Sequence, residues 1–445
     1  MHWRAYFIRF IWFCKGEDSY KKFKQLLVEE KLPRKEIEKL QLERLKKFIS
    51  HCYENVPYYT ELFDSKNIKP SDINSVQDLQ RIPVLTKKLA RENLDKLVDT
   101  SLSSKKLIKI RTSGSTGTPF TIYDTRKERN ERNEVLLSNL WTFYRRCGWL
   151  PGERIATIWG QKGGKTNSIV KIKNYLMGVS YFNAWESNED NFNIWHQQLV
   201  RSSTKLLVCY SSVGARFAKW MIENNKKTPL LKGVYTTSEI LLDKQREEIQ
   251  AAFGCNVYDL YGCGEVLAIG CSCSSQKIHI NETLNIVETG KIDGKSNMPV
   301  ILTGLQNKTM PFLRYMNGDS IDVSEESCNC GRDTKTMGLS IARVSDTFKL
   351  KNGKSIPSLY FVLRLYKDGF DGVELFQFHQ MEIDKIDLKI LKNNKFDNQT
   401  LQALREVLNE IESHLEFEVK VKLCFVDKES FGSSLKHLYA KSDCK

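Results

Sequence analysis

The sequence predicts an α/β protein with a large N-terminal domain, built on mixed and parallel sheets, and a small C-terminal α+β domain of the ferredoxin-like kind. Between residues 154 and 260, short apolar segments alternate with helical patterns, which is typical of parallel strands joined by helices. From about residue 347 the pattern changes to strand, helix, strand, strand, helix, strand, which indicates a separate small unit. The segments that carry this second pattern are 358–365, 375–382, 386–390, 399–412 and 417–425. The chain has 445 residues, 41% of them hydrophobic, which is enough for a core in each domain.

The chain starts with an aromatic, apolar segment, residues 3–13, which carries Arg4 and Arg9. Arg9 interrupts the apolar run and no small-residue cleavage site follows, so a signal peptide is not expected. We prefer a helix that packs on the protein's own body, because amphipathic stretches usually bury one face in their own core. The alternative is a helix that makes weak contact with a membrane surface.

Two helical regions come next. In residues 17–64, apolar residues recur at helical spacing among many charges, and a turn at 55–59 ends this region. A second helical region reaches about residue 98, with Pro70 and Pro83 as punctuation. These segments predict a helical beginning of the large domain.

A loop rich in glycine and hydroxyl side chains follows, between strand-like segments at 107–110 and 120–123. Its glycines let successive backbone N–H groups point into one hollow, which is a natural anion-binding nest. Its hydroxyls add neutral donors, so the loop suits the phosphates of a nucleotide, and a flexible linker is the weaker interpretation. We therefore expect the phosphate-binding residues to be Thr112, Ser113, Gly114, Ser115, Thr116 and Gly117.

The central part of the chain alternates strands with helices. The expected helices are 127–146, 168–178, 189–201, 212–224 and 243–253. The expected strands are 154–159, 206–209, 233–236 and 257–260. From about residue 278 the pattern turns to short strands with turns between them, at 284–288 and 300–303. This order predicts parallel pairing in the central part.

The formal net charge of +14 and the twelve cysteines limit the classes of protein to which the chain can belong. Lys and Arg are spread along the whole chain and no nucleic-acid-binding module is recognisable, so we expect a solvated basic surface and no nucleic-acid partner. Scattered cysteines without a secretory signal are typical of reduced thiols or metal ligands in a cytoplasmic protein, rather than of a disulfide framework. No apolar run of about 18 residues occurs, so we expect no transmembrane segment.

Further stretches follow the loop in a fixed order and carry a resemblance. Residues 112–119 resemble the phosphate loop of the adenylate-forming superfamily of acyl-CoA ligases. Tyr-Gly-Cys-Gly-Glu at 261–265 resembles its Tyr-Gly-x-Thr-Glu motif, and Arg-Tyr-Met-Asn-Gly-Asp at 314–319 resembles its Arg-Tyr-x-x-Gly-Asp motif. The branch resembled most is the phenylacetate–CoA ligase and CapK-like capsule-biosynthesis group. The segments shared with that branch are 56–59, 83–87 and 328–332.

The resemblance covers the chain from about residue 35 to the end and implies a chemistry. Enzymes of this superfamily join a carboxylate to AMP, release pyrophosphate and pass the acyl group to a thiol. Their small domain rotates about a hinge, which here would lie at about 344–347, between a large domain of 1–343 and a mobile domain of 347–445. The implied ligands are a small carboxylic acid, ATP, Mg²⁺ and CoA, with an amine or hydroxyl as the alternative acceptor.

The same resemblance assigns roles to single residues. Asp319 would hold the ribose hydroxyls, since a carboxylate accepts two hydrogen bonds at once. Glu265 would bind Mg²⁺ on the phosphates as a hard oxygen ligand. The alternatives are an aspartate that caps a turn and a solvated surface glutamate. The other nucleotide-binding residues that the resemblance implies are Tyr261, Gly262, Thr237, Ser238, Glu239 and Arg343, with a core role open for Tyr261.

Two departures from the family pattern bear on activity. Gly264 replaces the usual Thr or Ser before Glu265, and Leu435 replaces the glycine of a C-terminal Gly-Lys pair. Lys436 is therefore the candidate adenylation lysine, a mobile cation that would contact the acyl-phosphate oxygens in the transition state. Lys441 is the fallback, and an ordinary surface lysine is the alternative. These departures keep open a second hypothesis, a nucleotide-binding homologue with impaired catalysis.

Cysteines and one histidine gather in two stretches, residues 271–279 and 328–330. Soft thiolates plus an imidazole suit a closed tetrahedral Zn²⁺ site, and free buried thiols are the alternative. In this branch the resemblance points to Cys273, His279, Cys328 and Cys330, with Cys271 as a spare. The site would be structural, because it would tie the segment after the first motif to the loop after the second.

The sequence thus predicts an ATP-dependent, phenylacetate–CoA ligase-like enzyme that forms acyl-AMP and transfers the acyl group to CoA or another acceptor. The CapK-like features extend the hypothesis to the biosynthesis of a surface or capsular polysaccharide. By the same resemblance, residues 181–185 and 208–212 would line the acid pocket. Their aromatic side chains favour a flat acid, although such side chains serve as often in a core.

Overall fold

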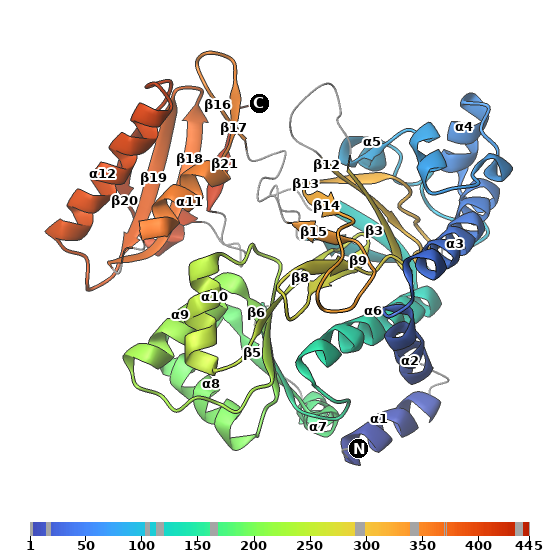
Figure 1. Ribbon diagram of the computed structural model, residues 1–445, viewed down its shortest axis with the longest axis horizontal. Helices are drawn as coiled ribbons and strands as arrows, with labels where there is room; N and C mark the ends of the chain where they lie inside the picture. Colours follow the sequence, from blue (N-terminus) through green and yellow to red (C-terminus); the bar gives the residue numbers. More distant parts are fainter. Residues whose placement is uncertain are drawn as a thin grey trace. The chain divides into compact units, whose positions relative to one another are not determined.

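The structure is a computed structural model, and it describes residues 3–14, 19–102, 107–112, 120–160, 168–289, 299–338, 347–368, 370, 372–431 and 439–444. The chain divides into two compact units, whose helices and strands are labelled in Figure 1. The first unit consists of Met1–Leu241, Gln245–Asn317 and Ile321–Leu339, and the second of Leu242–Lys244, Gly318–Ser320 and Ser340–Lys445. The predicted hinge at 344–347 lies outside the described residues, except for its last position, and stays a prediction.

Four helices open the first unit, as the helical spacing of apolar residues predicts. They are α1 (Trp3–Cys14), α2 (Ser19–Glu29), α3 (Arg34–Asn55) and α4 (Pro57–Ser65). Pro57 stands in the first turn of α4, where its missing N–H group costs no hydrogen bond. Phe48 of α3 and Phe63 of α4 enter one buried core with Phe312. None of the helices in the described part of the chain has the length and apolar character needed to cross a bilayer.

The second predicted helical region, up to about residue 98, is only partly helical. It holds the 3₁₀ turns η1 (Pro70–Asp72) and η2 (Gln77–Arg81), the short strand β1 (Leu85–Thr86) and the helix α5 (Lys87–Glu92). The Asp78 carboxylate accepts hydrogen bonds from the backbone N–H groups of Asn74 and Ser75. Such local bonds favour turns over a continuous helix.

A nine-stranded mixed sheet forms the centre of the first unit, in the order β14-β15-β10-β9-β8-β7-β6-β4-β5. The neighbours β5, β4, β6, β7 and β8 pair in parallel, which confirms the predicted pairing. Their bounds are β4 (Ile155–Trp159), β5 (Val179–Asn183), β6 (Leu206–Tyr210), β7 (Gly233–Thr237) and β8 (Val257–Cys263). The antiparallel remainder is β9 (Leu267–Ser272), β10 (Ile278–Ile280), β14 (Asp322–Ser324) and β15 (Thr336–Gly338).

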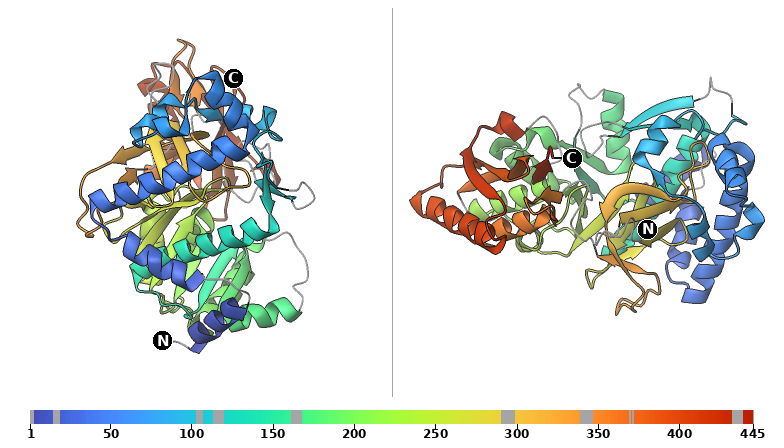
Figure 2. Two further views of the ribbon diagram at one scale, coloured as in Figure 1. Left: turned by 90° about the vertical axis from the view of Figure 1, so that its right-hand side faces the viewer. Right: turned by 90° about the horizontal axis from the view of Figure 1, so that it is seen from above.

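Helices cover both faces of this sheet (Figure 1). On one face, Trp141 of α6 (Arg126–Tyr144) shares a buried core with Leu206 and Val208 of β6. On the other face lies α9 (Ser211–Glu223), where a Cβ on Gly214 would stand 2.7 Å from Cys209 Sγ. The helices between the strands are α7 (Ser168–Met177), α8 (Glu189–Arg201) and α10 (Asp243–Phe253), all close to their predicted bounds. Figures 1 and 2 show α1 beside α7 at one end of the unit.

Two smaller sheets complete the first unit. A four-stranded sheet has the order β1-β13-β12-β11, with β11 (Asn285–Thr289), β12 (Pro299–Gly304) and β13 (Tyr315–Ser320). The strands β2 (Leu107–Thr112) and β3 (Phe120–Thr125) form an antiparallel pair. They are the strand-like segments predicted on either side of the glycine-rich loop, so that loop connects the two strands of a hairpin.

The second unit is an α+β structure, as the tail of the sequence predicts. Its sheet has the order β20-β19-β18-β21 and is accompanied by two helices. The elements are β18 (Val373–Glu382), β19 (Lys385–Lys392), β20 (Lys420–Phe425), β21 (Ala440–Ser442), α11 (Leu359–Asp368) and α12 (Asn398–His414). The opening strand of the predicted pattern is instead a separate hairpin, β16 (Thr347–Lys349) with β17 (Ser355–Pro357), and β21 takes the position beside β18.

Candidate active site

The first candidate motif, residues 261–265, lies at the turn between β8 and β9. The ladder between these strands shifts register at Tyr261 and Gly262, which is a bulge that redirects the chain. A Cβ on Gly262 would collide with the carbonyl oxygen of Leu267, so only glycine fits there. Glu265, at the end of the turn, is buried, with 7% of its surface exposed.

The second candidate motif supplies partners to the first one. In β13, Tyr315 and Asn317 are two positions apart and therefore share one side of the strand, and Asp319 follows Gly318, whose φ is 94°. The Tyr315 hydroxyl donates to Glu265 Oε1 at 3.2 Å, and Asn317 Nδ2 donates to the Tyr261 hydroxyl at 3.0 Å. Burial, together with the Glu265 carboxylate, raises the pKa of Tyr315 well above its usual value, so the phenol stays a donor.

Arg314 anchors the start of β13. Its guanidinium donates to the backbone carbonyl groups of Gln80 and Ile82, and it forms an ion pair with Glu288, Nη2 to Oε1, at 3.0 Å. The residue has a φ of 50°, an uncommon value for a non-glycine residue. Sequence reasoning gave Arg314 no role beyond membership of the motif, and the structure shows that it fixes the segment that carries Tyr315.

Three of the predicted nucleotide-binding residues, Thr237, Ser238 and Glu239, lie at the end of β7 and directly after it. Thr237 is the last residue of that strand and pairs with Tyr210 and Leu260 on the two neighbouring strands. The Glu239 carboxylate accepts a hydrogen bond at 2.9 Å from the backbone N–H group of Ser212, at the start of α9. A carboxylate there caps the helix and complements its dipole. Glu239 thus has a structural partner in addition to the nucleotide contact that the sequence predicts.

Aromatic side chains gather where the parallel strands end. Trp159 at the end of β4 stacks on Tyr210 at the end of β6, with ring centroids 4.7 Å apart and planes at 20°. Tyr181 in β5 and Trp185 just after it are 49% and 44% exposed, whereas Tyr210 itself is buried. The carboxyl ends of parallel strands are where open α/β sheets bind ligands. Trp159 was missed by the sequence analysis, and its place at the end of a predicted strand was the available signal.

Several predicted site residues lie outside the described part of the chain. They are Ser113, Gly114, Ser115, Thr116, Gly117, Arg343 and Lys436, together with the side chain of Thr112. Their roles therefore stay predictions. The fallback lysine, Lys441, is described in β21 and forms an ion pair with Asp443, Nζ to Oδ1, at 3.1 Å.

The structure brings the four predicted metal ligands together. One donor atom from each of Cys273, His279, Cys328 and Cys330 lies within 4.8 Å of the other three. Cys273 Sγ is 3.6 Å from Cys328 Sγ, and Cys330 Sγ is 3.2 Å from His279 Nε2. Three thiols and one imidazole match the donor set of a closed zinc site. Cys271 does not join this group, because it packs in the core shared with Trp141.

Residues around the cluster orient His279 and shift the pKa values of His279 and Cys330. His279 Nδ1 lies 2.8 Å from Thr334 Oγ1 and 3.3 Å from the Thr334 carbonyl, which leaves Nε2 for the thiol side. Burial, with help from Arg146 and Arg332, lowers the pKa of His279 to about 4, so the imidazole is neutral at pH 7. Although burial acts in the opposite direction, hydrogen bonding to Arg332 holds the pKa of Cys330 below that of an ordinary thiol.

Charged pairs connect the cluster to the N-terminal helices. Glu30, just after α2, accepts from Arg332 Nε at 3.1 Å and from Arg146 Nη2 at 3.2 Å. Arg34 of α3 forms a two-pronged pair with Glu282, at 2.6 and 2.8 Å. The cluster is therefore supported on several sides by charge-assisted hydrogen bonds.

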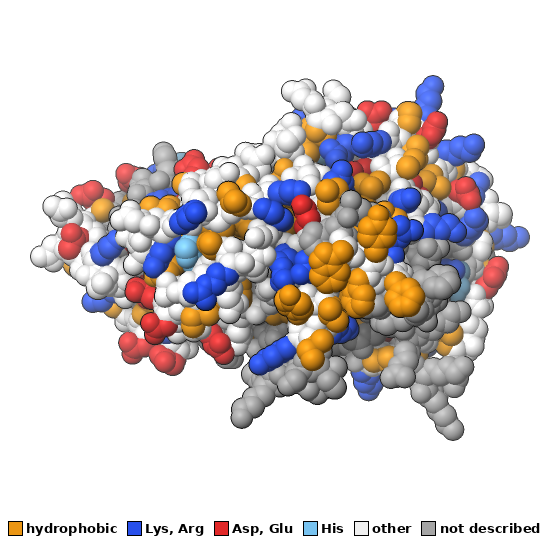
Figure 3. Space-filling view, turned by 90° about the horizontal axis from the view of Figure 1, so that it is seen from below, with side chains coloured by type: hydrophobic (Ala, Val, Ile, Leu, Met, Phe, Trp, Pro, Cys, Tyr) orange, Lys and Arg blue, Asp and Glu red, His pale blue; other side chains and the backbone are white. Residues whose placement is uncertain are grey.

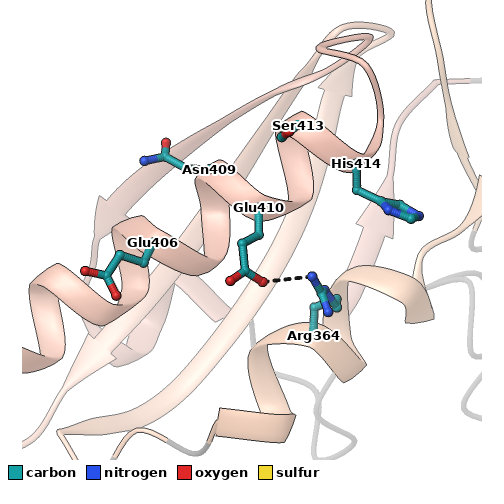
Figure 4. A pocket seen from close by; sticks show the side chains of 6 residues that line it. All are labelled: Arg364, Glu406, Asn409, Glu410, Ser413 and His414. Carbon is teal, nitrogen blue, oxygen red and sulfur yellow. Dashed lines mark hydrogen bonds and ion pairs between the residues drawn. The ribbon is translucent and has the colours of Figure 1, made fainter.

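A pocket in the second unit contains none of the predicted site residues (Figure 4). It is lined by Arg364 of α11 and by the α12 residues Glu406, Asn409, Glu410, Ser413 and His414. Arg364 and Glu410 form an ion pair across it at 2.8 Å, and the α12 side chains are exposed. The pocket is a surface feature of two helices, and it brings together no group that the activation of an acid requires.

Known proteins resemble this chain in sequence. No family model matches the chain. Protein CapK of Staphylococcus aureus is 24% identical over 396 residues, which cover 86% of this chain and 82% of CapK. The phenylacetate-coenzyme A ligase of Escherichia coli K12 is 31% identical over 307 residues, which cover 64% of this chain and 66% of that enzyme.

Solved structures share the fold. A 2-hydroxyisobutyryl-CoA ligase, solved with an acyl-AMP in the postadenylation state, has a TM-score of 0.73 at 17% identity and covers 94% of this chain and 91% of its own. An acyl acid amido synthetase has a TM-score of 0.61 at 12% identity, with 95% and 94% covered. These structures define the class, the adenylate-forming fold. With the sequence relatives, the chain belongs to the adenylate-forming superfamily as a phenylacetate–CoA ligase-like member.

Proposed function

We propose that this protein activates a small carboxylic acid with ATP and then transfers the acyl group to CoA. A carboxylate oxygen of the acid attacks the α-phosphorus of ATP, the bond to the β-phosphate oxygen breaks, and pyrophosphate leaves. The thiolate of CoA then attacks the acyl carbon of acyl-AMP, and AMP leaves. The alternative acceptor is an amine or a hydroxyl group.

The observation that carries this proposal is the pair of hydrogen bonds between the two motifs, Tyr315 to Glu265 and Asn317 to Tyr261. These bonds explain why the chain carries both motifs, since side chains of the second motif orient side chains of the first. Glu265, held by Tyr315, would bind Mg²⁺ on the phosphates as a hard oxygen ligand. Asp319, two residues after Asn317 in β13, would accept hydrogen bonds from the ribose hydroxyls.

The remaining nucleotide contacts rest on the order of the motifs. The loop at 112–117 would surround the phosphates with N–H and hydroxyl donors. Lys436 would neutralise charge that develops on the acyl-phosphate oxygens. The mobile second domain, attached through a hinge near Arg343, would bring this lysine to the nucleotide for the first step and remove it for the second.

The aromatic group at the strand ends supports a flat acid. The ring of Trp159, stacked on the buried Tyr210, offers an exposed apolar face, and Tyr181 and Trp185 add exposed rings on neighbouring segments. Aromatic faces stack well on planar ligands and less well on branched aliphatic ones. An aryl or arylacetic acid is therefore the substrate class we expect.

A structural zinc ion would be held by Cys273, His279, Cys328 and Cys330, whose donor atoms match a closed site and whose imidazole is neutral at pH 7. The ion would supply folding stability rather than chemistry. It would hold the segment after β9, which begins beside Glu265, to the loop after β14, which follows Asp319.

Acid-dependent exchange of radioactive pyrophosphate into ATP tests the proposal. We expect exchange with Mg²⁺ and at least one aromatic carboxylic acid, and none without acid. Lys436→Ala should abolish exchange, whereas Lys441→Ala should leave it near the wild-type rate. If no acid in a broad panel supports exchange, the activation of an acid is refuted. If Lys436→Ala is fully active, Lys436 is not the adenylation lysine.

A second function has one specific feature in its favour. Gly264 stands where the family has a hydroxyl residue, so the phosphates lose one donor. A nucleotide-binding homologue with impaired catalysis would bind ATP in calorimetry and yet show no exchange with any acid. Gly264→Thr would then raise exchange from background, which distinguishes an impaired enzyme from a protein with another function.

A role in surface or capsular polysaccharide biosynthesis follows from the likeness to CapK alone. It predicts an acceptor on a sugar, an amine or a hydroxyl group, in place of CoA. A comparison of acyl transfer to CoA and to amino sugars, started from the same acyl-AMP, decides between these acceptors.

A further inference from the structure

The first helix, α1, has two apolar faces. Ala5 and Ile8 are buried, and Ile8 belongs to the core that also holds Trp141. Trp3, Tyr6 and Phe10 occupy the opposite side, and each is more than half exposed. Their spacing of three and four residues places them in one row along the helix. Packing on the protein's own body thus accounts for only one side of this segment.

The neighbouring helix α7 extends the exposed row. Helices α1 and α7 pack together, and the Arg4 guanidinium lies 4.6 Å from the Trp3 ring and 5.9 Å from the Tyr175 ring. Ile172 and Tyr175, one helical turn apart on α7, are also more than half exposed. Figure 3 shows, on the underside of the molecule, apolar side chains gathered between Lys and Arg side chains. We call Trp3, Tyr6, Phe10, Ile172 and Tyr175 the α1–α7 face.

The charged side chains of these two helices all have one sign. The sequences of α1 and α7 contain Arg4, Arg9, Lys171 and Lys173 and neither Asp nor Glu. Arg9, Lys171 and Lys173 are exposed. Burial, and in second place Arg154, lowers the pKa of Arg4, so Arg4 and the neighbouring Arg154 repel each other. An anionic surface would relieve that repulsion.

We propose that the α1–α7 face docks on an anionic lipid bilayer. Trp and Tyr side chains favour the interface between headgroups and acyl chains, because their rings are apolar and their polar atoms reach water. Lysines and arginines next to an apolar row hold such a surface to anionic lipids. A symmetric contact between two copies would instead bring these cations against each other, which disfavours self-association.

Sedimentation of the full chain with lipid vesicles tests this proposal. We expect binding to vesicles of phosphatidylglycerol mixed with phosphatidylcholine, and binding weaker by about tenfold or more to pure phosphatidylcholine or in high salt. Ile172→Ser with Tyr175→Ser should weaken binding about tenfold or more, because two exposed apolar side chains no longer enter the interface. Lys171→Gln with Lys173→Gln should weaken it about tenfold.

Matched controls come from exposed residues elsewhere. Leu230→Ser and Lys88→Gln change side chains that are 79% and 85% exposed and should bind vesicles like the wild type. Unchanged circular dichroism would show that the α7 variants fold. Equal binding to neutral and anionic vesicles, or variants that bind like the controls, would overturn the proposal. A dimer that forms without lipid and is dissolved by the same substitutions would assign the face to a second copy.

Discussion

Two polar centres of the first unit lie at opposite ends of one strand, β9, and they are stabilised differently. Glu265 comes before β9 and has the Tyr315 hydroxyl, at 3.2 Å, as its partner. Cys273 comes after β9 and belongs to the four-residue cluster. Two single hydrogen bonds, only one of them to a charged group, connect the first centre, whereas pairs between Arg and Glu side chains surround the second. The cluster has the character of a fixed anchor, and the motif centre that of a site kept adjustable for a ligand.

A second segment of the chain, from β13 to the loop after β14, also joins the two centres. Tyr315 and Asn317 lie in β13, and Cys328 and Cys330 follow β14, the next strand. Both segments thus run from the motif centre to the cluster. If zinc joins their far ends, the near ends are held in the register that the two hydrogen bonds between the motifs need. The comparison predicts that changes at the motif centre affect catalysis, while changes at the cluster affect stability first.

Glu265→Gln tests, with the largest expected effect, whether the motif centre serves catalysis rather than stability. The amide keeps an oxygen that can accept from Tyr315 but removes the charge that would bind Mg²⁺ on ATP. We expect pyrophosphate exchange to fall about 100- to 1000-fold, the loss typical of one electrostatic contact in a transition state. The unfolding free energy should stay close to that of the wild type. Glu61→Gln, at an exposed ion pair with Lys96, is the matched control. A reversed result, a large loss of stability with normal exchange, would make Glu265 a structural residue.

Asp259 lies in β8, next to the strand β9 that joins the two centres. Its substitution should have the next largest effect, on the free energy of unfolding. The Asp259 backbone N–H group donates to Ser272 Oγ at 2.7 Å, and Ser272 precedes Cys273. Burial raises the pKa of Asp259 to about 7, against a value near 4 in an unfolded chain. The protonated carboxyl therefore stabilises the fold below about pH 4, and this contribution is lost as the pH rises through about 7.

Asp259→Asn cannot ionise, so it should gain stability relative to the wild type as the pH rises. From pH 5 to pH 8 the difference in unfolding free energy should move by about 3 kcal/mol in favour of Asn. Urea unfolding at several pH values measures it, with the exposed Asp322→Asn as the control that should show no such trend. A difference that is independent of pH would mean that Asp259 is ionised in the fold throughout this range.

Removal of the metal tests whether the four-residue cluster stabilises the fold. Elemental analysis should find about one zinc ion per chain, the number that one tetrahedral site binds. With free zinc at about 100 times the dissociation constant, a strong chelator should cost about 2.7 kcal/mol of unfolding free energy. Cys328→Ser with Cys330→Ser should lose the metal, while Cys271→Ser should keep it, because Cys271 lies outside the cluster. Metal-free wild-type protein of full stability would reduce the cluster to packed thiols.

The sequence located those elements whose signal is local. The parallel strands β4, β6, β7 and β8 are short apolar runs between amphipathic helices, so periodicity was sufficient to find them. The three-residue strands β10, β14 and β15 are too short for any alternation to show, and their place in the sheet depends on distant partners. The region of η1 and η2 was expected to be more helical, because bonds such as those at Asp78 are not visible in a pattern of apolar residues.

In the candidate site, too, some features could be predicted from the sequence and others needed the fold. The order of the motifs identified Glu265 and the four metal ligands as candidates, because their residue types suit the chemistry. It gave no partner for Glu265 and no task for Arg314, since hydrogen bonds between residues some 50 and more than 200 positions apart need the fold. Glu239 illustrates the opposite case: the motif suggested a nucleotide contact, and the structure adds a helix cap at α9.

Tyr315→Phe should have the smallest effect and sharpens the comparison most. It removes the hydrogen bond to the Glu265 carboxylate and keeps the ring, which packs in a core with Phe312. A hydrogen bond to a charged group is worth about 1.5 kcal/mol or more, so exchange should fall about tenfold. In the Glu265→Gln background the same change should cost much less, because the charge that the phenol orients is already gone. A full tenfold loss in both backgrounds would show that Tyr315 acts independently of Glu265, and the hydrogen bond would then not be what couples the two motifs.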